Sequence, residues 1–102
     1  MKLLQDVLYG VSIESVVGST TQSIDQIHFD SRLVKDRSVF VALRGQLSDG
    51  HAHIDSAVAK GAVCVVCEVL PDTIQKGVTY IHTASTRLAL AVMAANFYDR
   101  PS

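Results

Sequence analysis

The alternation of apolar and polar residues predicts a chain in which short strands and helices follow one another. Strands are expected at residues 11–17, 24–29, 39–43, 62–68 and 78–82. Each of these stretches is short and rich in β-branched or other apolar residues, as strands usually are. The stretch 11–17 alternates like a half-buried strand, whereas 39–43 is almost continuously apolar, which is typical of a strand covered on both faces.

Helices are expected where apolar residues recur at helical spacing, namely at residues 2–8, 51–60 and 85–98. Asp49 and Ser85 are expected to cap the second and third helices, and Gly61 to end the second. The order strand, helix, strand over 39–68 predicts a parallel pair of strands joined by a crossover. The predicted fold class is therefore α/β: a single Rossmann-like domain with a small mixed or mainly parallel sheet and helices on its faces.

The helix expected at 85–98 is apolar around much of its circumference. One stripe holds Leu88, Val92 and Ala95, and a second holds Leu90, Met93, Ala94 and Phe97. Such a helix is expected to be covered on more than one side. The domain's own sheet accounts for one side, and either a neighbouring domain or a crowded core for the other.

Composition narrows the possible functions. The 102 residues suit one domain, and 48% of them are apolar, near the globular average. Only 19% are charged, so some of the surface is expected to be covered. A formal net charge of −1 without a basic run argues against nucleic-acid binding. No apolar run is long enough for a membrane span, and Gln5 and Asp6 interrupt the N-terminal stretch too early for a signal peptide. A cytoplasmic protein is expected.

Cys64 and Cys67 have the spacing of a redox or metal-binding pair. They fall within the strand expected at 62–68, where residues three apart point to opposite faces. Their sulfur atoms would then neither bond to each other nor share a metal ion. We therefore expect two buried, reduced thiols rather than a redox module.

Polar residues follow two of the expected strands. Asp30-Ser31-Arg32 follows the first, and its side chains either hold the loop by hydrogen bonds or contact a ligand. The loop from Gly45 to Gly50 precedes a helix start, where backbone N–H groups favour anions. It is not a P-loop, because none of the six glycines is followed by lysine.

His51 and His53, together with Asp49, raise the possibility of a metal site. Residues two apart at a helix start point in different directions, because helical neighbours are three and four apart. We therefore expect no metal site. No arrangement for nucleophilic catalysis follows from the spacing either, so no catalytic residue is assigned.

Taken together, these segments resemble the N-terminal domain of the Mur ligases, the ATP-dependent amide-forming enzymes of bacterial peptidoglycan precursor synthesis. The segments that carry the resemblance are Asp30-Ser31-Arg32, Val39-Phe40-Val41-Ala42-Leu43-Arg44-Gly45, Asp49-Gly50-His51, Gly61-Ala62 and Phe97-Tyr98-Asp99-Arg100-Pro101-Ser102. Within the family they are most similar to the MurE type, which extends UDP-N-acetylmuramoyl-L-alanyl-D-glutamate by diaminopimelate or lysine. The MurF type, which adds D-alanyl-D-alanine, is the nearest alternative.

The resemblance implies a division of labour. The N-terminal domain holds the UDP end of the substrate, a central domain with a P-loop binds ATP and Mg²⁺, and a C-terminal domain brings the incoming amino acid. Residues 1–102 would then be the first domain alone, with the central and C-terminal domains as its partners. Because it has no P-loop, this chain is expected to bind its substrate and not to catalyse the reaction.

The resemblance also implies site residues. Those expected to contact the uracil and ribose are Phe29, Ser31, Gln46, Leu47 and Ser48. Four more are expected to be scaffolding: Asp30, Arg32, Asp49 and Gly50. The chain departs from many relatives at Arg37-Ser38, where they have Gly-Asp, and at His53, where Phe is usual. The alternative is a scaffold or interaction domain that has kept the fold without the ligand.

Overall fold

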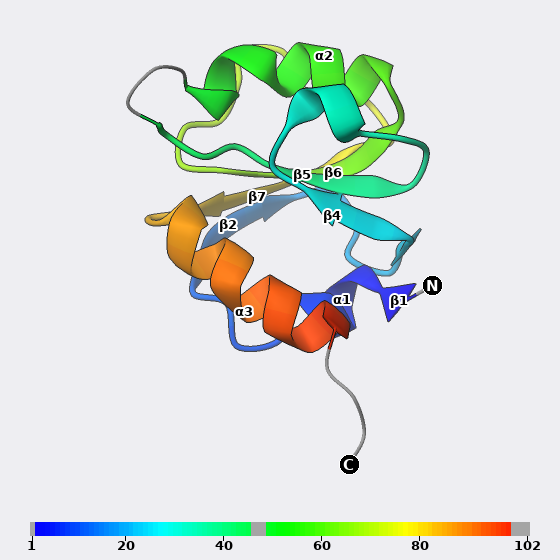
Figure 1. Ribbon diagram of the computed structural model, residues 1–102, viewed down its shortest axis with the longest axis vertical. Helices are drawn as coiled ribbons and strands as arrows, with labels where there is room; N and C mark the ends of the chain where they lie inside the picture. The colour runs from blue at the N-terminus through cyan, green and yellow to red at the C-terminus, as the bar shows by residue number, and fades with distance from the viewer. Residues whose placement is uncertain (1, 46–48, 99–102) are drawn as a thin grey trace.

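The computed structural model describes residues 2–45 and 49–98, and its main element is a five-stranded sheet with helices on both faces (Figure 1). The strand order is β2 (Ile13–Val17), β7 (Thr79–Thr83), β6 (Ala62–Cys67), β5 (Ser38–Val41) and β4 (Gln26–His28). Strands β4 to β7 are parallel to one another, and β2 is antiparallel to β7. The parallel strands therefore present their carboxyl ends at one edge of the sheet.

The helices divide between the two faces. The α-helix α2 (Ile54–Ala59) and the 3₁₀ turns η1 (Ser31–Leu33) and η2 (Gly50–His53) lie on one face (Figure 1). The helices α1 (Leu4–Val7) and α3 (Thr86–Tyr98) lie on the other. This arrangement confirms the predicted fold class. None of the described helices is long and apolar enough to cross a membrane.

The core consists of two apolar layers separated by the sheet. Val39 of β5 packs in the layer beneath α1 and α3, whereas Phe40 packs in the layer beneath α2. Strand β5 is buried throughout, which confirms the prediction of a strand covered on both faces. Cys64 and Cys67 lie in different layers, as predicted, and burial raises the pKa of both thiols, that of Cys67 to about 11.

The prediction of one strand over 24–29 is wrong, because the chain bends between Ile24 and Gln26. Residues Ser23–Ile24 form β3, which pairs with β1 (Lys2–Leu3) in a separate small sheet. Arg37 holds the bend: its carbonyl accepts from the Asp25 N–H at 2.9 Å, and its guanidinium donates to the carbonyl of Ser23 at 2.6 Å.

Three other predicted elements differ in extent. The helix expected at 2–8 is limited to α1, because Lys2 and Leu3 are paired with β3. The helix expected at 51–60 starts with a 3₁₀ turn, because the Ala52 N–H bonds to the carbonyl three residues back, that of Asp49. Strand β2 is shorter and more exposed than expected, because it lies at the edge of the sheet and pairs only with β7.

Arg37 occupies a backbone conformation that usually requires glycine. Its φ of 62° lies in the left-handed region, where side chains other than glycine are strained. Its N–H donates to the carbonyl of Gly61 at 3.0 Å, and its guanidinium also bonds to the Ser23 hydroxyl at 2.7 Å. The turn therefore keeps the geometry that glycine would give, and the bonds to Ser23 offset its backbone strain.

Gly61 and Gly77 provide a matched test of backbone and steric constraints. Both have positive φ, 114° and 87°. A Cβ at Gly61 would lie 2.8 Å from the Asp36 Cα, whereas a Cβ at Gly77 would have no neighbour within 4 Å. We predict that Gly77→Ala lowers the free energy of unfolding by about 1 kcal/mol and Gly61→Ala by about 3 kcal/mol or more. Urea denaturation measures both, and equal losses would contradict the steric argument.

Candidate functional site

A pocket of about 460 Å³ opens at the carboxyl ends of β4 and β5. Its walls come from the turn after β4, the segment after β5, the η2 turn and the first turn of α3. The lining residues are Phe29, Asp30, Ser31, Arg32, Phe40, Leu43, Arg44, Gly45, Gly50, His53 and Arg87. Ligands of parallel α/β sheets bind outside the carboxyl ends of the strands, which makes this pocket the candidate site.

The wall after β4 combines an exposed aromatic ring with a fixed turn. Phe29 is 60% exposed, although it is a large apolar residue. The Asp30 carboxylate accepts from the Arg32 N–H at 2.9 Å and from the Arg32 guanidinium at 2.8 and 3.0 Å. These bonds to Arg32 lower the pKa of Asp30 to about 2. The Ser31 hydroxyl has no hydrogen-bond partner within residues 2–45 and 49–98, so it is available to a ligand.

The wall after β5 depends on Gly50. Its N–H donates to the carbonyl of Leu43 at 2.7 Å, and a Cβ there would lie 2.8 Å from the Leu43 nitrogen. Only glycine therefore allows this close approach. The Asp49 carboxylate accepts from the His51 N–H at 2.9 Å. This bond confirms Asp49 as an N-cap, and the element that it caps is η2. The expected ligand contacts Gln46, Leu47 and Ser48 lie outside the described residues.

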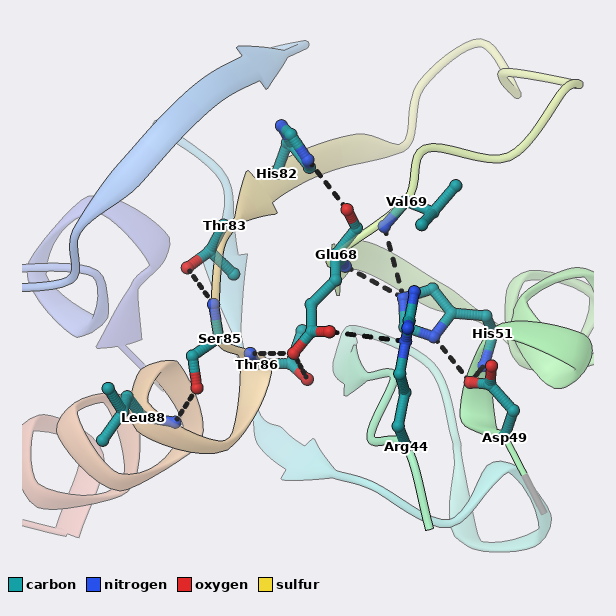
Figure 2. A network of polar contacts seen from close by, with 10 residues as sticks. All are labelled: Arg44, Asp49, His51, Glu68, Val69, His82, Thr83, Ser85, Thr86 and Leu88. Atoms are coloured by element: carbon teal, nitrogen blue, oxygen red, sulfur yellow. Dashed lines mark hydrogen bonds and ion pairs between the residues drawn. The ribbon is translucent and has the colours of Figure 1, made fainter. Parts of the chain in front are cut away.

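His51 connects this wall to the end of β6 (Figure 2). Its Nδ1 lies 2.7 Å from the Asp49 carboxylate, and its Nε2 accepts from the N–H groups of Glu68 at 2.9 Å and Val69 at 3.4 Å. Backbone N–H groups can only donate, so Nε2 is the unprotonated nitrogen and Nδ1 carries the hydrogen. Both ring nitrogens are therefore already engaged. Within the part of the chain that the structure describes, no cluster of three or more His, Cys, Asp or Glu residues is placed to hold a metal ion.

Glu68 continues the network to the start of α3 (Figure 2). Its carboxylate accepts from the Thr86 N–H at 2.9 Å and from the Thr86 hydroxyl at 3.2 Å, and its other oxygen lies 3.4 Å from Arg44 Nε. The backbone bond from Thr86 is the main reason that the pKa of Glu68 is lowered. Ser85 accepts from the Leu88 N–H at 3.2 Å, which confirms its predicted capping role. One carboxylate thus ties the segment after β5 to α3.

The structure brings five of the expected site residues together on the pocket: Phe29, Asp30, Ser31, Arg32 and Gly50. Asp49 lies beside it as the cap of η2. Sequence reasoning missed Arg44, His53 and Arg87 as lining residues, and it missed the bridging roles of His51 and Glu68. The available signals were the charged residues that follow β4, β5 and β6, namely Asp30, Arg44 and Glu68, and the sequence Asp49-Gly50-His51.

A second pocket of about 410 Å³ lies between α3 and the segment leading into β2. Leu88 and Val92 of the first apolar stripe line it, and Leu88 is 69% exposed. Ala89 and Met93 instead pack against the sheet. Among the described residues, the outer side of α3 therefore remains uncovered, which argues against a crowded core as its cover. Cover by a neighbouring domain stays a prediction.

A family model and curated relatives both show similarity of this chain to Mur ligases. The family model described as "Mur ligase family, catalytic domain" matches residues 23–98. The UDP-N-acetylmuramoyl-L-alanyl-D-glutamate–2,6-diaminopimelate ligases of Cytophaga hutchinsonii and Phocaeicola vulgatus are 44% and 38% identical, each over 97% of this chain. The chain spans about a fifth of the length of these curated relatives.

Solved structures give the same picture of the fold. A crystal structure of MurF from Acinetobacter baumannii matches with a TM-score of 0.78 and 26% identity, over 93% of this chain and 20% of that one. The MurF ligase of Thermotoga maritima in complex with ADP matches with a TM-score of 0.60 and 29% identity, over 68% of this chain and 16% of that one.

His51 and His53 form a matched pair for testing the network. We predict that His51→Ala lowers the free energy of unfolding by about 1–3 kcal/mol, because the N–H groups of Glu68 and Val69 lose their acceptor. His53 is exposed and makes no side-chain hydrogen bond among the described residues, so His53→Ala should change stability by less than about 0.5 kcal/mol. Urea denaturation compares the two, and equal effects would contradict the bridging role of His51.

Glu68 makes stability depend on pH. Its pKa in the folded chain is below the ordinary value of 4.5, so its charged form stabilises the fold at neutral pH, and this contribution is lost as the pH falls through the folded pKa. We predict that Glu68→Gln is less stable than the parent chain at pH 7 by about 1 kcal/mol, and that the gap closes below pH 4.5.

Asp72→Asn serves as the control for Glu68→Gln, because Asp72 is exposed and has no ion pair among the described residues. Urea denaturation of the three chains between pH 7 and pH 3 measures the gap. A gap for Glu68→Gln that stays constant with pH would show that the carboxylate charge plays no part.

Proposed function

The chain belongs to the Mur ligase family, and from this premise we propose that it binds the UDP moiety of UDP-N-acetylmuramoyl-L-alanyl-D-glutamate as the first domain of a MurE-type ligase. Residues 1–102 would form the N-terminal, UDP-substrate-binding domain. The central and C-terminal domains of the ligase would be its partners in the bacterial cytoplasm.

The observation that carries the proposal is the pocket beside Phe29 and Ser31. Its volume of about 460 Å³ lies within the range of small-ligand sites. An exposed ring offers a flat apolar surface to a base, and a free hydroxyl offers one hydrogen bond. The pair of Asp30 with Arg32 fixes the turn that carries both. Asp49 and Gly50 fix the opposite wall, and they directly follow the proposed contacts Gln46, Leu47 and Ser48 in the sequence.

The names of the relatives favour the MurE type over the MurF type. The 2,6-diaminopimelate ligases of Cytophaga hutchinsonii and Phocaeicola vulgatus reach 44% and 38% identity, whereas the MurF structures named above reach 26% and 29%. The same names favour diaminopimelate over lysine as the amino acid that the whole ligase adds. The substrate carboxylate that reacts would lie outside this pocket, since the pocket takes the nucleotide end.

We place ATP and Mg²⁺ in the rest of such a ligase. When bound there, ATP would activate the substrate carboxylate for attack by the incoming amine. The residues of this chain do not fit a triphosphate site. A P-loop needs glycine followed by lysine, and none of the glycines of this chain is followed by lysine. The role proposed for this chain is therefore to bind and orient the substrate, with no catalytic residue of its own.

An NMR titration with UDP tests the proposal. We predict that millimolar UDP shifts the signals of residues 29–32 and of the segments around Arg44 and Gly50. Ser31→Ala should weaken binding by about two- to tenfold, because a neutral hydrogen bond contributes about 0.5–1.5 kcal/mol. Ser56→Ala, at an exposed serine of α2, is the control and should leave binding unchanged.

Two results would contradict the proposal. One is the absence of any shift at millimolar UDP, which would favour a scaffold domain that has lost its ligand. The other is a set of shifts confined to the second pocket, between α3 and the segment leading into β2.

A further inference from the structure

The candidate pocket carries an excess of positive charge that the contacts to a base and ribose do not explain. Among the described residues, Arg32, Arg44 and Arg87 line it together with a single carboxylate, that of Asp30. Asp30 already binds the Arg32 guanidinium through two hydrogen bonds, so Arg32 is neutralised. The charge that remains comes from Arg87 and from Arg44, which Glu68 offsets in part through a single contact at 3.4 Å.

These two arginines differ from Arg32 in how they are held. Arg44 contacts Glu68 through Nε alone, at 3.4 Å, and more than half of its side chain is exposed. Arg87 makes no ion pair or side-chain hydrogen bond within residues 2–45 and 49–98. The terminal nitrogens of Arg44 and the whole guanidinium of Arg87 are therefore available to an anion.

Glu68 places the two arginines on the same pocket. One of its carboxylate oxygens contacts Arg44, and the other accepts from the N–H of Thr86, the residue before Arg87 (Figure 2). The segment after β5 and the first turn of α3 are thus fixed to one group. Guanidinium groups bind phosphate oxygens with paired hydrogen bonds, which suits them to a diphosphate.

We infer that Arg44 and Arg87 form the phosphate-binding part of the pocket and take the diphosphate of a uridine nucleotide, while Phe29 and Ser31 take its nucleoside. The inference rests on the proposed function and adds to it the residues that bind the negatively charged phosphates of the ligand. Glu68 is a positioning residue behind both arginines.

The test compares uridine, UDP and inorganic pyrophosphate by NMR titration of this chain and two variants. Arg87→Gln removes a guanidinium from an exposed position in the first turn of α3. Lys76→Gln is the control, because it removes one positive charge from an exposed loop away from the pocket. The folded state of each variant is checked by its amide spectrum.

We expect the parent chain to bind UDP at least tenfold more tightly than uridine. Arg87→Gln should remove most of this difference and leave uridine affinity unchanged, and Lys76→Gln should preserve it. Pyrophosphate should shift the amide signals of Arg44 and Arg87 in the parent chain. It should leave the Arg44 signal unshifted in Arg87→Gln.

Two results would overturn the inference and leave the proposed function standing: equal affinity of the parent chain for UDP and uridine, or equal weakening of both ligands by Arg87→Gln. Binding of pyrophosphate without uridine or UDP would support the phosphate site and contradict the nucleotide assignment. Binding of none of the three would contradict both.

Discussion

The hydrogen bonds that His51 accepts from the end of β6 are the constraint on which the candidate site depends. His51 belongs to the turn after β5, and its Nε2 receives the N–H groups of Glu68 and Val69. Glu68 then holds the start of α3 through Thr86. Segments that are far apart in the sequence are thereby fixed at one edge of the sheet (Figure 2). His51 and Glu68 together hold the segments that carry Arg44 and Arg87 at the same edge of the sheet.

The parallel sheet explains why these segments meet at all. The turn after β4, the turn after β5 and the start of α3 after β7 all leave the sheet at its carboxyl edge. Each contributes a different chemistry to the pocket: an exposed ring and a hydroxyl, a guanidinium beside a glycine loop, and a second guanidinium. The scaffold is rigid because the sheet is buried between two apolar layers. The family's fold therefore supplies the geometry, and the residues at the strand ends supply the proposed specificity for a uridine nucleotide.

Local pattern was enough to predict most of the fold. Strand β5 is buried on both faces because it is continuously apolar, and Gly61 ends α2 with a positive φ because its side chain is a hydrogen. The break between β3 and β4 was not predictable from local pattern, because it depends on the side chain of Arg37, which reaches Ser23 from a distant segment. In the site, too, local pattern predicted some residues, and contacts between distant segments determined the others. Ser31 was suggested by its place after an apolar strand, whereas Arg87 reaches the pocket only through the packing of α3 against the sheet.

A crystal structure of this chain with UDP tests the nucleotide site most directly. We predict electron density for the nucleotide in the pocket at the carboxyl ends of β4 and β5, with the uracil beside Phe29, the ribose near Ser31 and the phosphates against Arg44 and Arg87. Density in the second pocket between α3 and the segment leading into β2, or uracil at Arg87 with the phosphates directed into solvent, would contradict this prediction.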